Sequence, residues 1–176
     1  MSAGESVVYR RAEERDTEEI LRLWMGMMSE HVRFDGRICP TPSAADAYAA
    51  YLAYHLKSPE SLCLAAEAAD RPAGGAEAPR LRKAARLAAY CLAFISQNLP
   101  MFEPRSFGFV SDVVVDEGWR GQGIGTELLA RAKDWMRQKG ITVVQLQVYT
   151  QNRRGAAFWA KQGFASLYER MWLDLE

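Results

Sequence analysis

Alternating glycines occur in a short segment that could bind phosphate. Residues 120–126 read Arg-Gly-Gln-Gly-Ile-Gly-Thr, with glycines at Gly121, Gly123 and Gly125. Because glycine has no Cβ, successive main-chain amides there can approach an anion closely. A helix that begins near Ile124 would add unpaired amides and the positive end of its dipole, which bind phosphate without a metal. The segment therefore predicts a pyrophosphate site, to which Arg120 adds a charge-assisted contact.

The spacing of the glycines separates this segment from two common nucleotide-binding motifs. A P-loop has Lys and then Ser or Thr after its last glycine, whereas Thr126 and Glu127 stand there. A dinucleotide fingerprint reads GxGxxG and follows the first strand of its fold, whereas this segment reads GxGxG late in the chain. Both alternatives are disfavoured, and a tight turn made only for packing is the remaining structural explanation.

Apolar segments on both sides of the loop are needed to position it. Val113, Val114 and Val115 form a run typical of a buried strand. After the predicted helix, residues 141–149 indicate a second buried strand parallel to the first, since a helix connects the two. A last helix carries Phe158 and Trp159 and ends at Gly163. Residues 164–175 then predict a closing strand, with Leu167, Met171 and Leu173 as its apolar residues.

The first half of the chain predicts a strand, two helices and two further strands. The two helices are expected to start at Asp16, with Glu19 completing the cap, and at Ser43, and to end near His31 and before Pro59. The strands are expected over residues 7–9, 61–66 and 87–95. Residues 70–82 are rich in Ala, Gly, Pro and charge and are expected to form a hairpin connection. The whole chain, 1–176, is interpreted as one domain.

Composition excludes several classes of function. The 22 basic and 22 acidic residues cancel, so no overall field would recruit nucleic acid or an anionic membrane. The three cysteines, Cys39, Cys63 and Cys91, are widely spaced and come with only two histidines, which argues against a metal site. We expect no metal, no nucleic-acid partner and no membrane partner. The absence of an apolar leader or span predicts a cytoplasmic location.

With these residues in place, the chain resembles the GNAT superfamily of N-acetyltransferases. The family's cofactor motif is Arg or Gln, two residues, Gly, one residue, and Gly or Ala, which Arg120, Gly123 and Gly125 match. The resemblance covers roughly the second half of the chain. It implies an α/β (α+β) fold with a mixed, mostly antiparallel central sheet, a parallel splayed strand pair and about four flanking helices. It also implies acetyl-CoA as co-substrate.

The resemblance carries specific residues to the cofactor. The pantetheine arm would lie between two splayed strands and bond to the main chain of the first one. The amides of the glycine loop would hold the pyrophosphate, and Asn152 would contact the pantetheine while also serving as a helix cap. The implied cofactor-binding residues are Val113, Val114, Val115, Arg120, Gly121, Gln122, Gly123, Ile124, Gly125, Thr126, Asn152 and Trp159.

Two positions depart from the family's pattern of acid and base. Many members carry a glutamate base where Ser111 stands, and a tyrosine that protonates the leaving thiolate where Trp159 stands. Asp112 is the candidate base, although strand alternation would turn it away from the face of Ser111 unless a bulge intervenes. Tyr149 is the candidate acid. Tyr168 is a second tyrosine near the wedge, which is the gap between the two splayed strands. A CoA thiol can also leave as the thiolate with modest help.

These residues predict an N-acetyltransferase that moves an acetyl group to a primary amine of a small molecule or a protein. The amine attacks the thioester directly, so none of the cysteines is needed as a nucleophile. The alternative is a CoA-binding module with weak or no turnover, motivated by Ser111 and Trp159. The sequence pattern does not identify the amine that accepts the acetyl group. Because similar folds often pair through sheet edges, a homodimer is the expected assembly.

Overall fold

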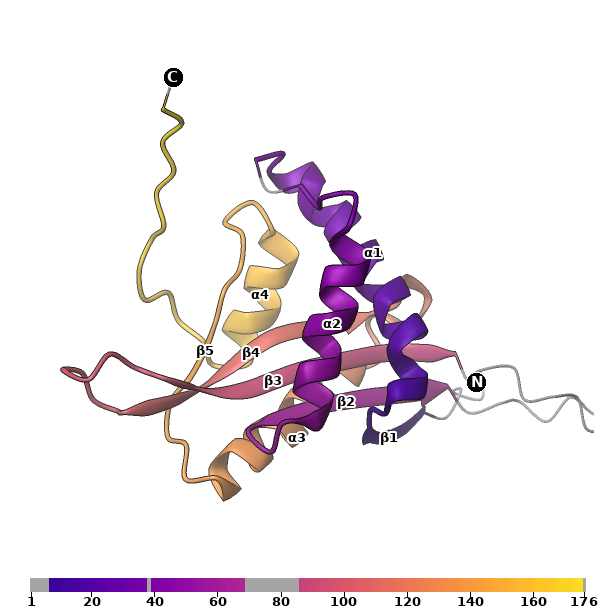
Figure 1. Ribbon diagram of the computed structural model, residues 1–176, viewed down its shortest axis with the longest axis horizontal. Coiled ribbons are helices and arrows are strands. Elements are labelled where there is room, and N and C mark those ends of the chain that lie inside the picture. The colour runs from indigo at the N-terminus through magenta and orange to yellow at the C-terminus, as the bar shows by residue number, and fades with distance from the viewer. Residues whose placement is uncertain (1–6, 38, 69–85, 176) are drawn as a thin grey trace, which may run out of the picture.

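The computed structural model describes residues 7–37, 39–68 and 86–175, and the predicted connection at 70–82 lies outside them. Within these ranges, five strands and four α-helices follow one another (Figure 1). Their bounds are β1 Val7–Arg11, α1 Thr17–Phe34, α2 Ala44–Lys57, β2 Ser61–Ala68, β3 Leu87–Gln97, β4 Ser106–Val115, α3 Ile124–Gln138, β5 Val144–Leu146 and α4 Arg153–Lys161. Short 3-10 turns precede α1 and follow β4.

The strands form one sheet in the order β1-β2-β3-β4-β5. The first four pair antiparallel, and β5 runs parallel to β4. A parallel neighbour is possible here because α3 supplies the crossover between the two strands. The predicted mixed, mostly antiparallel sheet with one parallel pair and four helices is confirmed.

Helices cover both faces of the sheet (Figure 1). On one face, Ile20 and Leu23 of α1 and Leu52 of α2 pack on Cys63, Leu92 and other strand residues. On the opposite face, Leu128, Leu129 and Met136 of α3 pack on Leu62, Cys91 and their neighbours. Alternate residues of the central strands supply the two cores, which is why β2 and β3 are buried along most of their length.

The start of α1 differs from the predicted cap. Asp16 makes no capping bond to the helix and is 4% exposed. Its two carboxylate oxygens instead accept from the Arg10 guanidinium of β1 at 2.7 and 2.8 Å, and one also accepts from the Glu13 amide. Burial alone would raise the pKa of Asp16, but these donors outweigh it and the pKa lies below its ordinary value. The ion pair therefore ties α1 to the sheet edge.

The two strands predicted at the C-terminal end are corrected by the structure. β5 spans three residues and is half-buried, whereas 141–149 was expected to be a buried strand. Residues 165–175 form no strand, and Leu167, Met171 and Leu173 are 75%, 92% and 80% exposed. Both differences have the same cause, which is that residues 165–175 do not return to the sheet. β4 is therefore the single strand partner of β5 among the described residues. Figure 1 shows this segment leaving the body in yellow.

Two searches of the described residues bear on function. No helix among them is both long enough and apolar enough to cross a lipid bilayer. In the same residues, no three or more His, Cys, Asp or Glu side chains gather where they could hold a metal ion.

Candidate active site

The loop between β4 and α3 depends on two glycines in the left-handed region of backbone conformation. Gly121 has φ 81° and Gly123 has φ 83°, a region that costs other residues about 1–2 kcal/mol. An added Cβ would meet nothing within 4 Å at either position. Glycine is therefore favoured at both positions because of the positive φ of the backbone, and not because a side chain would lack space.

Consecutive main-chain amides at the start of α3 have no acceptor in the part of the chain that the structure describes. They belong to residues 121–126, and the next amide, that of Glu127, donates to the Gly123 carbonyl at 3.0 Å. The segment is exposed at Gly121, Gln122, Gly123 and Thr126, while Ile124 and Gly125 are buried. Free amides at the N-terminus of a 15-residue helix make a site for an anion such as phosphate.

The first turn of α3 lies against β4 at Gly125. A Cβ at Gly125 would stand 3.4 Å from Val115 Cγ2 and 3.6 Å from Val113 Cγ1. Val113 and Val115 thus face α3, whereas Val114 is 6% exposed in the core under α1 and α2. An added Cβ would make ordinary contacts there, and a side chain that extends beyond Cβ would push the helix away from the strand. The loop amides and the end of β4 therefore lie close together.

The parallel strands β4 and β5 separate beside this loop. Their pairing runs from Gly108 with Val144 to Val110 with Leu146 and ends there. Beyond Val110, β4 continues to Val115 with β3 as its one strand partner in the described chain. The edge of β4 from 111 to 115 is therefore open on the β5 side, which is the splay that the family resemblance implies.

Arg120 connects the loop to β4 and to α1. Its Nε donates to the Val115 carbonyl at 3.0 Å, and its Nη2 donates to Glu30 at 2.6 Å. The guanidinium is thus turned toward α1 in this structure. The predicted contact with phosphate stays a prediction for this side chain.

A bulge in β4 decides which way Asp112 points. Leu92 of β3 pairs with Asp112, but the next residue, Ala93, pairs with Val110, so Ser111 is the extra residue. Val110 faces α3 and Asp112 faces α2 in consequence. The bulge on which the prediction for Asp112 depended is present.

Asp112 is a buried carboxylate with tyrosine partners. It is 7% exposed and accepts a hydrogen bond of 2.9 Å from the Tyr48 hydroxyl. Tyr48 and Tyr90 share a further hydrogen bond of 3.1 Å. Burial raises the pKa of Asp112 to about 6, against the opposing effects of the Tyr48 and Ser111 hydroxyls. The group can therefore exchange a proton near neutral pH.

Aromatic side chains of α1 and α2 surround this carboxylate. Trp24 stacks on Tyr48 with ring centroids 4.3 Å apart, and Tyr51 lies next to Tyr48 at 5.8 Å. Tyr51 is 37% exposed, and burial raises the pKa of its phenol above the ordinary value although the Ser111 hydroxyl opposes this effect. The sequence predicts the helix that carries Tyr48 and Tyr51, but it does not identify Tyr48 as the partner of Asp112. No spacing in the sequence links α2 to β4, so only the fold brings the two together.

The remaining predicted residues lie after β5. Asn152 caps α4 by accepting from the Gly155 amide at 2.8 Å, as expected. Trp159 packs edge-on against Phe158 and Phe164, with centroids 4.8 and 5.5 Å away. The Tyr149 ring lies 5.0 Å from that of His31 on α1. Tyr168 is 66% exposed on the C-terminal segment.

Two of the three cysteines are poor nucleophiles in this fold. Burial raises the pKa of the Cys63 thiol to about 12 and raises that of Cys91 as well. Both are protonated at neutral pH, and both lie in the sheet core. A covalent intermediate on either sulfur is disfavoured.

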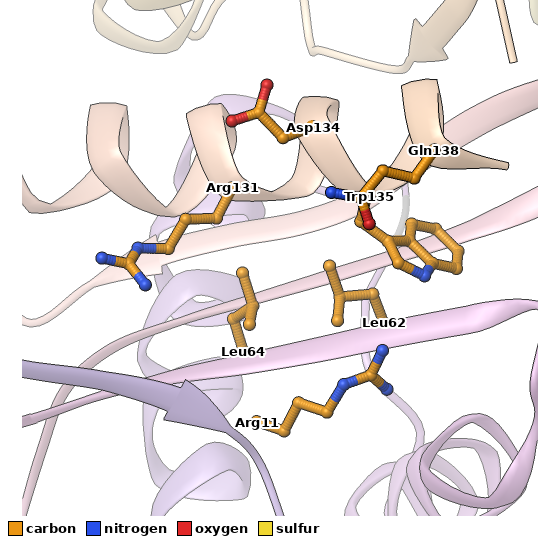
Figure 2. Close-up of a pocket in the computed structure, with 7 residues that line it drawn as sticks. All are labelled: Arg11, Leu62, Leu64, Arg131, Asp134, Trp135 and Gln138. Atoms are coloured by element: carbon orange, nitrogen blue, oxygen red, sulfur yellow. The ribbon is translucent and has the colours of Figure 1, made fainter. Parts of the chain in front are cut away.

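A groove on the α3 side of the sheet lies apart from this site. Figure 2 shows it between Arg131 and Trp135 of α3, the β2 leucines Leu62 and Leu64, and Arg11 of β1. Its volume is about 290 Å³. It opens at the β1 edge of the sheet, whereas the wedge lies between β4 and β5 at the opposite edge.

Known proteins resemble this chain in sequence and in fold. The model of the acetyltransferase (GNAT) family matches residues 24–164. An uncharacterized N-acetyltransferase of Methanocaldococcus jannaschii is 32% identical over 62 residues, which are 35% of this chain and 27% of the relative, so the match spans about a quarter of that protein.

Solved structures cover nearly the whole chain. A mutant of the BH1408 protein from Bacillus halodurans superposes with a TM-score of 0.75 at 24% identity, over 96% of this chain and 99% of that one. A predicted acetyltransferase of Clostridium acetobutylicum, solved with acetyl-CoA, gives a TM-score of 0.71 at 17% identity, over 97% and 96%. At these identities the likeness concerns the fold.

Proposed function

Because the chain belongs to the acetyltransferase (GNAT) family, we propose that it transfers an acetyl group from acetyl-CoA to a primary amine of a small molecule or a protein. Transfer forms a bond between the amine nitrogen and the acetyl carbon and breaks the thioester carbon–sulfur bond. The protein's tasks are to hold the donor, to orient the amine and to accept a proton.

The proposal rests on one observation, the run of free main-chain amides at residues 121–126, which lies beside the open edge of β4. The amides and the dipole of α3 suit a pyrophosphate. This end of the helix lies against Val113 and Val115 at Gly125, so the main chain of the strand lies within reach of the same ligand. These features fit CoA, whose diphosphate is followed by an arm with two amides that can bond to a strand edge.

Asn152, Trp159 and Arg120 complete the proposed donor site. The Asn152 carbonyl oxygen is used in the cap of α4, which leaves its Nδ2 free to donate to the pantetheine arm. Trp159 belongs to the apolar cluster on the α3 side and would supply an apolar wall. Arg120 would add positive charge if its guanidinium turned from Glu30 toward the phosphates.

Asp112 is the proposed general base. An amine acceptor is mostly protonated at pH 7, since its ordinary pKa is ~10.4. With a pKa of about 6, the Asp112 carboxylate is ionised at neutral pH and can receive that proton, and the Tyr48 hydroxyl orients it. Trp159 has no acidic proton for the leaving sulfur, so Tyr149 is the proposed donor, or the thiolate leaves unaided.

Binding and turnover are tested separately. Titration calorimetry of the full chain with acetyl-CoA is expected to give saturable binding, and its absence would refute the donor site. Release of CoA thiol is then measured with a polyamine, an aminoglycoside, an amino acid and a lysine peptide. Release that depends on an acceptor supports transfer. Binding without release from any acceptor supports the alternative, a CoA-binding module with little or no turnover.

A further inference from the structure

Five aromatic rings form a continuous group, the aromatic face, on the α2 side of the sheet. They are Tyr51, Tyr54 and His55 of α2, Phe94 of β3 and Phe109 of β4. The His55 ring joins the helix to the sheet, since it stacks on Phe94 with centroids 4.7 Å apart and meets the Tyr51 ring edge-on at 4.4 Å. Phe94 and Phe109 pair in register, with ring centroids 5.4 Å apart. The rings therefore follow one another without a break from α2 to β4.

Part of the aromatic face is open to solvent. Tyr51 is 37% exposed and Tyr54 is 69% exposed, while Phe94 and Phe109 are half-buried. His55 is buried between them, and burial lowers its pKa below the ordinary value, so its imidazole is neutral at pH 7. Adjacent apolar rings that stay partly exposed, with no positive charge among them, are typical of a ligand-binding surface.

The aromatic face adjoins the proposed base and the open edge of β4. Phe109 lies two residues before Ser111, the extra residue of the bulge, where the pairing of β4 with β5 has ended. The Ser111 hydroxyl is close enough to the Tyr51 phenol to lower its pKa. The Tyr51 ring also lies 5.8 Å from that of Tyr48, which donates to Asp112. A substrate whose amine lies near Ser111 and Asp112 therefore has its remaining atoms beside the Tyr51 ring.

The charges near the aromatic face suit one ammonium group and not several. Asp112 is the carboxylate beside it, whereas Glu30 and Asp35 at the end of α1 are paired with Arg120 and Arg37. Over the ranges that the structure describes, no three acidic side chains lie close enough together to share a metal ion. A polyamine or an aminoglycoside carries several ammonium groups, and a complementary site would offer each of them a carboxylate.

We propose that the acceptor is an arylalkylamine, a primary amine whose short carbon chain carries an aromatic ring, and that the aromatic face binds this ring. The inference rests on the proposed function, since it assigns the acceptor of the same site. The amine nitrogen bonds to the acetyl carbon, the thioester bond breaks with its electrons on the CoA sulfur, and Asp112 receives the proton from nitrogen. Aromatic rings pack edge-on or offset on one another, a contact that an alkyl chain or a sugar does not make.

The first experiment adds phenethylamine and n-butylamine to the acceptor panel and measures release of CoA thiol. Phenethylamine is expected to give a kcat/KM about tenfold or more above that of n-butylamine, which has the amine without the ring. It should also exceed spermine and kanamycin. Equal rates with n-butylamine, or faster transfer to spermine or kanamycin, would overturn the inference and leave the proposed acetyl transfer standing.

Substitutions at Tyr51 separate ring binding from proton chemistry. Tyr51→Leu should raise the KM for phenethylamine about tenfold and change that for acetyl-CoA by less than about twofold. Tyr51→Phe keeps the ring and should stay near wild type. Tyr9→Leu is the matched control, because Tyr9 lies on β1 at the opposite edge of the sheet. An unchanged KM in Tyr51→Leu, or equal losses in both Tyr51 variants, would contradict ring binding.

A binding measurement decides the case in which no amine is acetylated. Saturation-transfer NMR of phenethylamine with the CoA-loaded protein detects contact between its ring protons and the protein. Saturation of the ring is expected, with a weaker signal in Tyr51→Leu, and its absence would overturn the inference. Ring saturation without thiol release from any acceptor would count against acetyl transfer alone, so the two proposals fail on different readouts.

Discussion

The Tyr48 hydroxyl on α2 donates a hydrogen bond of 2.9 Å to the Asp112 carboxylate on β4. This contact joins α2 to the strand that precedes the glycine loop. The hydrogen bond holds the carboxylate in place and opposes the effect of burial on its pKa. The net result of the opposing effects is a pKa of about 6 for Asp112. The proton chemistry proposed for the site depends on the balance of these two effects.

The rate of acetyl transfer is expected to rise with pH through an apparent pKa near 6 in kcat/KM, because Asp112 must be ionised to act as a base. Tyr48→Phe removes a donor that lowers this pKa, so its profile should shift to higher pH. Asp112→Asn is expected to lower kcat/KM by roughly 100-fold or more. Tyr9→Phe removes a hydroxyl from β1 and should leave the profile in place. Equal profiles for wild type and Tyr48→Phe would argue against this role.

The stability of Asp112→Asn should exceed that of the wild type at pH 8. The folded pKa, about 6, lies above the ordinary value of 3.8. Stability from this group is therefore fully present below pH ~4 and is lost as pH rises through 6, by about 3 kcal/mol. Urea unfolding of both proteins at pH 4 and pH 8 measures the difference, which should vanish at the lower pH. A variant less stable than wild type at pH 8 would contradict this account.

Gly123→Ala should weaken acetyl-CoA binding about tenfold, because the strain at φ 83° is relieved by turning the loop amides away from the ligand. Gly140→Ala is the matched control. Gly140 has φ 76° and equally open surroundings, but it lies at the far end of α3. Each change should cost about 1 kcal/mol of stability. Calorimetry should find lower affinity for Gly123→Ala alone.

Two substitutions separate the roles of Asn152. Asn152→Asp keeps an oxygen that accepts from the Gly155 amide, so stability should be retained, whereas Asn152→Ala should cost about 1 kcal/mol. Both remove the Nδ2 donor, and both should weaken acetyl-CoA binding if that group contacts the pantetheine. Unchanged affinity in Asn152→Asp would limit Asn152 to the cap.

Gly26→Ala should stabilise the protein by roughly 0.5–1 kcal/mol, because Gly26 lies in the middle of α1 and alanine loses less conformational freedom on folding. A Cβ there would meet nothing within 4 Å. The melting temperature should rise without a change in acetyl-CoA affinity. A lower melting temperature would show that this part of α1 does not tolerate a side chain.

The sequence predicts the glycine loop and the elements beside it better than the surroundings of Asp112. The glycine loop, Val113–Val115 and α3 are contiguous, so local spacing was enough to place them. The pairing of Tyr48 with Asp112 joins residues 64 positions apart. It also depends on a bulge, which one sequence does not reveal because an extra residue leaves the apolar pattern readable on both sides.

The ends of the chain show the same limit. Asp16 was expected to cap α1 because its type and position suit a cap, but Arg10 of a different element takes its oxygens. Residues 164–175 have the apolar pattern of a strand, and the sequence predicts one. Strand formation also requires an edge within reach, and that is a property of the assembled sheet.

The extra residue in β4 has a consequence for the width of the wedge. A bulge bends its strand, and the pairing of β4 with β5 stops at Val110, the residue before Ser111. Deleting Ser111 would preserve the facing of Asp112 and Val113, yet it would straighten the strand and let the two parallel neighbours close up. One extra residue in β4 thus decides whether β4 and β5 pair along their whole length or leave a gap that an extended ligand can enter.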